Sequence, residues 1–138
     1  MRSPGFTVLE VLAALGLTAI LAGMGTVQLI ELVRSARLAS GARATASLLR
    51  LARGRALASN LEVEVAFDAA TASCSVRQAA SVLETRPLPP GVTFAALPAR
   101  GRILFGALGS AENGTVRLAA GLRTRRVIVN QRGRVRLQ

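Results

Sequence analysis

The chain has 138 residues, which leaves room for one membrane-spanning segment and one small globular domain of roughly 75 to 100 residues, but not for a second domain. All 18 of its basic residues are Arg and oppose 7 acids, so the formal net charge is +11. His, Tyr and Trp are absent and there is one Cys, so we expect no enzyme, no metal site and no cofactor, because the usual metal ligands and general bases are largely missing.

The first predicted element is an apolar helix over residues 6–30, in which Glu10 is the only charged residue. At about 1.5 Å per residue, this stretch is long enough to cross a bilayer core of about 30 Å. Arg2 precedes it and orients the amino end toward the cytoplasm. An ordinary secretory signal is the alternative, but its apolar region usually has only 7 to 15 residues. A carboxylate at membrane depth is costly and usually marks function.

The helix is predicted to continue through residues 31–59 as an amphipathic segment, because no Pro interrupts residues 6–60. Apolar and small residues recur there at spacings of three and four and define one face, which we expect to pack against a globular head. They are Leu38, Ala42, Thr45, Leu49, Ala52 and Ala56. On another face, Arg43, Arg50 and Arg53 are interpreted as solvated or as balancing acids of the head or of neighbouring subunits.

Residues 60–138 change to a period of two, which predicts a mostly antiparallel β head and an α+β fold. Turn residues such as Pro89-Pro90-Gly91 and Asn113-Gly114 separate the runs. The predicted strands cover 61–67, 74–78, 82–86, 92–95, 102–105, 115–119, 126–130 and 134–137. Cys74 has no internal disulfide partner, and we interpret it as a small buried residue rather than a reactive thiol.

The amino terminus, Met1-Arg2-Ser3-Pro4-Gly5-Phe6-Thr7-Val8-Leu9-Glu10, resembles the signal of type IV prepilins and type II secretion pseudopilins. The resemblance implies cleavage between Gly5 and Phe6 by a prepilin peptidase and then N-methylation of Phe6. Residues 1–5 would be the leader. Glycine at the cut agrees with this, because it leaves the backbone accessible to a peptidase. In a filament, Glu10 is expected to pair with the Phe6 amine of a neighbouring subunit, since an unpaired carboxylate among apolar helices is costly.

The carboxyl half resembles the GspH/FimT domain, whose members have a long helix and a β head of two sheets. The resemblance is carried by Gly101–Phe105, Asn113–Leu118, Val127–Asn130 and Gly133–Arg136. It implies a type IV pilin-like fold with a leader (1–5), a transmembrane or filament-core helix (6–30), an amphipathic helical half (31–59) and a β-rich head (60–138).

The carboxyl terminus is rich in arginine: residues 100–138 contain nine Arg and Glu112 as the only acid. Gly133-Arg134-Val135-Arg136 resembles the Gly-Arg-x-Arg element associated with DNA binding by FimT proteins. Alternation predicts that Arg132, Arg134 and Arg136 lie on one side of an extended segment and contact phosphates of double-stranded DNA without sequence preference. The candidate DNA-binding residues are Arg125, Arg126, Arg132, Gly133, Arg134 and Arg136. The absence of Lys also permits a plain alternative, in which a composition bias produces a solvated strand face.

Together with these patterns, the resemblance to the GspH/FimT family implies a minor pilin anchored in the inner membrane by one helix, with its head in the periplasm, that joins other pilins in a type IV pilus and binds DNA during natural transformation. The alternative is a minor pseudopilin of a type II secretion system, which would act in protein export without nucleic acid.

Overall fold

The computed structural model describes residues 7–138, and the side chains of all of these except residues 24–27. The chain divides between Val33 and Arg34 into two compact units. The helix α1 (Val8–Ser59) contributes to both. Its residues before Arg34 include residues 8–30 of the predicted apolar stretch, whose side chains are largely exposed wherever they are described, and Phe6 lies outside the described residues. By length and composition, α1 is apolar enough near its amino end to cross a membrane, although a signal sequence has the same properties.

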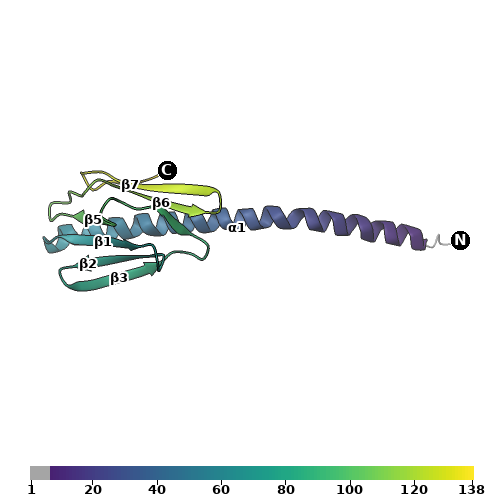
Figure 1. The fold of residues 1–138 in the computed structure, drawn as a ribbon, viewed down its shortest axis with the longest axis horizontal. Helices are drawn as coiled ribbons and strands as arrows, with labels where there is room; N and C mark the ends of the chain where they lie inside the picture. Colours follow the sequence, from purple (N-terminus) through teal and green to yellow (C-terminus); the bar gives the residue numbers. More distant parts are fainter. Residues whose placement is uncertain (1–6) are drawn as a thin grey trace. The chain divides into compact units, whose positions relative to one another are not determined.

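The second unit is an α+β head made of the carboxyl half of α1 and two four-stranded antiparallel sheets (Figure 1). The first sheet has the strand order β3-β2-β1-β5 and the second has the order β4-β6-β7-β8. The strands are β1 (Val63–Asp68), β2 (Ser73–Gln78), β3 (Ser81–Pro87), β4 (Thr93–Ala96), β5 (Arg102–Phe105), β6 (Gly114–Ala120), β7 (Arg123–Val129) and β8 (Val135–Leu137). All eight predicted strands are confirmed, and the largest shift in a boundary is the earlier start of β7, at Arg123 rather than Arg126.

The predicted face of the helix forms the centre of the core. All six of its residues are at most 2% exposed, and Ala46 and Leu48 are buried beside them. The inward residues of the strands, such as Val65 and Phe105 in the first sheet and Val116 and Val127 in the second, are fully buried against this face. Among the side chains that the structure describes, every buried apolar one lies between Leu38 and Val129. Residues 31–138 therefore contain the complete core, and we expect this head to fold on its own.

Asn60 ends the helix in a left-handed conformation with a φ of 55°. Asn tolerates this region better than most residues, and a left-handed residue is a common helix terminator. The chain then reverses into β1, which brings the first sheet against the helix that precedes it. The predicted change from helix to strand near residue 60 therefore has a local cause in the turn.

Cys74 is buried, at 2% exposure, on the core side of β2. Burial raises the pKa of its thiol from 9.0 to about 11, and a hydrogen bond with the Thr45 side chain lowers it by a smaller amount. The chain contains no Lys, Tyr or His, so Cys74 is the only side chain whose ordinary pKa lies between about 7 and 12. Alkaline changes in the stability of the head should therefore report on this one thiol.

We expect the head to lose stability between pH 9 and pH 11. In this window the thiol of the unfolded chain ionises while the buried thiol stays protonated, so the free energy of unfolding falls as pH rises, by roughly 2 to 3 kcal/mol in total. Urea unfolding of residues 31–138, followed by circular dichroism at successive pH values, measures this loss. The Cys74→Ala variant should show a flat profile over the same window. If the wild type and the Cys74→Ala variant lose the same stability between pH 9 and pH 11, the loss does not come from the Cys74 thiol.

Candidate functional site

The amino-terminal site predicted from the sequence is described only in part, because Gly5 and Phe6 lie outside the described residues. Glu10 lies exposed in the first turn of α1. Its backbone N–H donates to the Thr7 hydroxyl at 3.3 Å and to the Thr7 carbonyl at 3.0 Å. Thr7 is thus the helix cap, with Glu10 three residues later, as in a capping box. This role of Thr7 was not predicted, although the Thr-x-x-Glu spacing signals it.

Glu10 also borders a shallow hollow of about 390 Å³ along the exposed face of the helix. The other lining residues are Val11, Ala14, Leu15 and Thr18. The Thr18 hydroxyl donates back to the carbonyls of Ala14 and Leu15, so it adds no free donor to this surface. The result is a single carboxylate at the end of an otherwise apolar strip.

The second sheet carries the arginine-rich surface, and none of its four strands contains an acid. Arg117 of β6 lies directly opposite Arg126 of β7, and Arg136 of β8 lies opposite Ile128. Because side chains alternate along a strand and Val127 and Val129 are buried, Arg126 and Ile128 face away from the core. Arg117, Arg126 and Arg136 therefore share one exposed face, which we call the arginine face.

The arginine face has no acidic partner. None of its three members forms an ion pair with any residue in the part of the chain that the structure describes. Arg117 was missing from the predicted set, because the sequence does not give the register that places it beside Arg126. Two like charges directly opposite each other destabilise a strand pair, so this arrangement has an energetic cost within the head.

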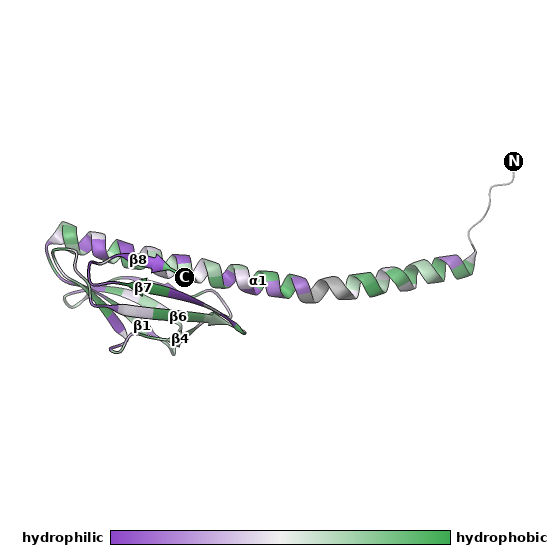
Figure 2. Ribbon diagram, turned by 90° about the horizontal axis from the view of Figure 1, so that it is seen from above, coloured by the Kyte–Doolittle hydropathy of each residue, from purple (hydrophilic) through white to green (hydrophobic). Residues whose placement is uncertain are grey.

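Arg125 is separated from this face, although the sequence analysis grouped it with Arg126. It lies opposite the buried Leu118 and shares the core-facing side of β7 with Val127, just beyond the end of the core, where it is exposed. Arg123 lies two residues further along the same side, in the pair that closes the β6–β7 hairpin. Figure 2 shows the hydrophilic start of β7 near this turn and its hydrophobic end within the head.

The prediction that Arg132, Arg134 and Arg136 line one side of an extended segment is wrong. The strand β8 begins only at Val135, and residues 131–132 form a turn. Gly133 has a φ of +67°, and the Asn130 side-chain oxygen accepts a hydrogen bond of 2.8 Å from the Arg134 backbone N–H. The turn interrupts the alternation on which the prediction depended.

Arg132 and Arg134 nevertheless lie together at a hollow of about 340 Å³. The hollow is also lined by Asn113, Asn130 and Gln131, so it is polar and has no acidic residue. Since Arg134 precedes β8 by one residue, the turn continues directly into the strand that carries Arg136. Arg132 and Arg134 thus extend the arginine face beyond the end of the sheet.

Gly133 is fixed in place by a contact with the helix. The Arg53 Nε donates to the Gly109 carbonyl oxygen at 3.2 Å, and Gly133 packs on both groups. A Cβ added at Gly133 would lie 2.8 Å from Arg53 Nε and would collide with the Gly109 carbonyl oxygen. Arg53, interpreted from the sequence as a solvated or balancing charge, in fact supports the turn of Arg132 and Arg134.

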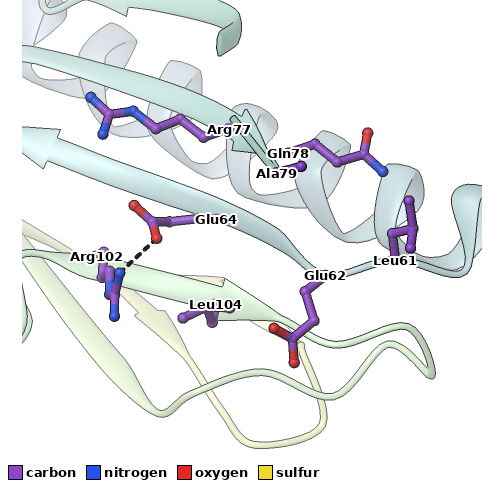
Figure 3. Close-up of a pocket in the computed structure, with 8 residues that line it drawn as sticks. All are labelled: Leu61, Glu62, Glu64, Arg77, Gln78, Ala79, Arg102 and Leu104. Atoms are coloured by element: carbon purple, nitrogen blue, oxygen red, sulfur yellow. Dashed lines mark hydrogen bonds and ion pairs between the residues drawn. The ribbon is translucent and has the colours of Figure 1, made fainter. Parts of the chain in front are cut away.

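The outer face of the first sheet differs, because acids lie beside its arginines. Arg102 and Glu64 form an ion pair there at 2.8 Å, and Arg77 lies opposite Glu64. The ion pair of Arg86 with Glu84, at 2.6 Å, lies instead on the side of β3 that faces the helix, because these residues are opposite the buried Cys74 and Val76. Figure 3 shows the Glu64–Arg102 pair at an open hollow of about 610 Å³ that Glu62 and Arg77 also line. Within residues 7–138, no three His, Cys, Asp or Glu side chains gather where they could hold a metal ion. This face is charge-balanced and offers a polyanion no net attraction.

The Gly133→Ala substitution should destabilise the head by roughly 1 to 3 kcal/mol more than Gly121→Ala. Both glycines have a positive φ, +67° and +61°, so both substitutions carry the same backbone strain. Only Gly133 is enclosed, because nothing lies within 4 Å of a Cβ built at Gly121. Urea unfolding of both variants of residues 31–138 measures the difference. Equal losses would show that the contact with Arg53 and Gly109 does not confine the turn.

Comparisons with known proteins identify the family and the fold. A family model described as "Type II transport protein GspH" matches residues 41–133. The fold is similar to that of the type IV minor pilin FimU of Pseudomonas aeruginosa, with a TM-score of 0.63, 18% identity, and coverage of 73% of this chain and 87% of that one. It is equally similar to that of the minor pseudopilin EpsH from the type 2 secretion system of Vibrio cholerae, with a TM-score of 0.62, 14% identity, and coverage of 73% and 94%. The comparison with curated proteins gave no match.

Proposed function

The chain belongs to the GspH/FimT family, as the sequence predicted, and from this premise we propose that it is a FimT-like minor pilin that supports assembly of a type IV pilus and binds extracellular DNA for natural transformation. Members of this family are minor pilins or minor pseudopilins, and the long helix with two antiparallel sheets is their fold. The proposed role is structural and involves no catalysis and no cofactor.

The proposed processing follows from the first ten residues. Residues 1–5 act as the leader, a prepilin peptidase cuts between Gly5 and Phe6, and Phe6 becomes N-methylated. Residues 6–30 then stay in the inner membrane as a single span, with the remaining helix (31–59) and the head (60–138) in the periplasm. The apolar side chains described in the amino half of α1 support this, because they are exposed and an apolar surface of this length suits a bilayer.

Glu10 is the proposed assembly residue. It is the only acid in the apolar half of α1 and is exposed at the end of an apolar strip. When such helices pack together in a filament, the carboxylate needs a positive partner, and the Phe6 amine of a neighbouring subunit supplies one. This pairing would set the axial register between subunits.

The single observation that carries the DNA proposal is the acid-free arginine face of the second sheet. Neighbouring strands lie about 4.8 Å apart, so Arg117, Arg126 and Arg136 form a compact group of forked donors that suit phosphate oxygens. Arg132 and Arg134 extend the group along the polar hollow. An anion bound across Arg117 and Arg126 would offset the repulsion between them.

Double-stranded DNA is the form proposed, and without sequence preference. Base stacking on single strands needs exposed aromatic rings, and the four aromatic residues of the chain are all Phe. Phe67 and Phe105 are buried, Phe94 packs edge-on against Phe67, and Phe6 precedes the described residues. The arginine face therefore offers contacts to the phosphate backbone only.

A type II secretion role is the second candidate function. The family model that matches is described as a type II transport protein, and the fold is as similar to the minor pseudopilin EpsH as to the minor pilin FimU. In this role the chain would act in a pseudopilus without nucleic acid, and the arginine face would be a solvated surface.

DNA binding is tested by gel shift of residues 31–138 on random-sequence duplex DNA over a salt series. We expect the wild-type head to bind and its affinity to fall steeply as salt rises. Changing Arg126→Gln with Arg136→Gln should weaken binding and reduce the slope of log affinity against log salt by about two, because two phosphate contacts are lost.

The matched control is Arg123→Gln with Arg125→Gln. It removes the same charge from the same hairpin, but on the core-facing side of β7. This variant should keep most of the binding. If both double variants lose the same DNA affinity, binding depends only on net charge and not on the arginine face. If the wild type does not bind DNA at low salt, the secretion role is favoured.

Processing is tested by intact-mass measurement of the full chain, expressed with and without a prepilin peptidase. With the peptidase, the chain should lose Met1–Gly5 and carry one methyl group on Phe6, and the Gly5→Leu variant should stay uncut because a side chain then blocks access to the backbone. Cleavage far beyond Phe6 would identify an ordinary secretory signal instead.

A further inference from the structure

The tip of the β6–β7 hairpin lies at the end of the head where the chain enters from the apolar segment. Arg37 donates to the Pro90 carbonyl at 3.5 Å, and a Cβ built at Gly41 would lie 3.5 Å from Val92. The next residue, Thr93, pairs with Ala119 of β6. The hairpin closes one residue later, at the pair of Ala120 and Arg123. The turn of Gly121 and Leu122 therefore lies at the same end of the head as Arg37.

Leu122 is the most exposed large apolar side chain among those that the structure describes, at 104%. It stands at the hairpin tip, where Gly121 makes the turn with a φ of +61° and has no atom near its Cβ position. A turn of this kind usually carries polar residues, and nothing in the head covers this leucine. Its position suits contact with an apolar phase outside the protein.

Two elements place arginines at the same end of the head as this leucine. Arg123 and Arg125 follow it on the core-facing side of β7, and Arg34 and Arg37 lie in the first turns of α1 within the head. All four are exposed. We name these four arginines and Leu122 the hairpin rim.

Asp68, the last residue of β1, is an acid at this end of the head. Glu31 precedes Arg34 by one helical turn along α1. The Asp68 carboxylate accepts hydrogen bonds from the Thr71 hydroxyl at 2.7 Å and from the Ala70 N–H at 2.8 Å, which lowers its pKa. Asp68 is thus engaged in its own turn, in the first sheet, and the rim keeps an excess of positive charge.

We propose that the hairpin rim docks the head on the anionic surface of the bilayer before the subunit enters a filament. Its arginines would contact lipid phosphates, and Leu122 would insert at the boundary with the acyl chains. The inference rests on the proposed membrane span of residues 6–30. That span ends four residues before Arg34, about 6 Å along a helix, so the rim is held near the bilayer by the chain itself.

The two kinds of contact reinforce each other. Basic side chains close to an anionic membrane each strengthen binding severalfold, and stable attachment generally needs a second signal besides one apolar group. The proposed membrane span would keep the head close to the bilayer, and the hairpin rim would determine which end of the head faces it. The arginine face lies on the outer side of the second sheet and would remain free while the rim is docked.

The test is co-sedimentation of residues 31–138 with vesicles of phosphatidylcholine, with and without phosphatidylglycerol. We expect binding only to the anionic vesicles. Arg123→Gln with Arg125→Gln should weaken it by about twentyfold, at roughly fivefold for each arginine, and Leu122→Ser should weaken it by about fivefold.

Matched controls separate the rim from general charge and hydrophobicity. Arg117→Gln with Arg126→Gln removes the same charge from the arginine face, and Leu108→Ser removes a leucine that is 90% exposed in a loop near Arg53, at the other end of the head. Both should bind anionic vesicles like the wild type. The proposal is overturned if the wild type does not bind, or if the controls weaken binding as much as the rim variants do.

A separate measurement tests the premise. Fractionation of cells that express the full chain shows whether it is in the membrane. If the full chain is membrane-bound but the head does not bind anionic vesicles, docking by the hairpin rim is wrong and the proposed membrane span still stands. If the full chain is soluble, the proposed span fails, whatever the vesicles show.

Discussion

The burial of one face of α1 between residues 38 and 56 is the constraint on which the rest of the head depends. Four of its buried residues are Ala, at positions 42, 46, 52 and 56, so the backbone of the helix lies close to the strands that cover it. Both sheets place their apolar side on this face, since Val65 and Val116 from different sheets belong to the same core. The inner side of each sheet is therefore committed to the helix. Only the outer faces, the turns and the edges are available to partners.

The outer faces of the two sheets differ in how their charges are arranged. On the first sheet, acids and arginines are paired, as in Glu64 with Arg102, so the surface is close to neutral. On the second sheet, arginines gather without acids, and Arg117 and Arg126 stand opposite each other. Such a pair lowers the stability of an isolated head, and an anionic partner would offset that cost. The difference in charge pairing, rather than the depth of any hollow, distinguishes a candidate binding surface from a structural one.

Much of the fold could be predicted from the sequence, because local patterns determine it. The helical face from Leu38 to Ala56 follows from spacings of three and four, and the strands follow from alternation between turn residues. The arginine face was harder to predict, because it depends on which residues of neighbouring strands lie opposite each other. Predicting that Arg117 lies beside Arg126 requires the register of β6 and β7. Predicting that Arg125 is exposed on the other side of β7 requires knowing where the core ends. The predicted extended segment is interrupted at Gly133, since a glycine inside an alternating run can mark a turn, and here it does.

The buried Cys74 and the composition around it have a consequence for how the head responds to its surroundings. His, Lys and Tyr, which titrate between about pH 6 and 11, are absent, and the one thiol stays protonated until about pH 11. The head therefore carries a nearly constant charge between about pH 6 and 9. Within this window, any pH dependence of its binding would originate in the partner, so the ionisation of a ligand can be measured against a head whose own charge does not change.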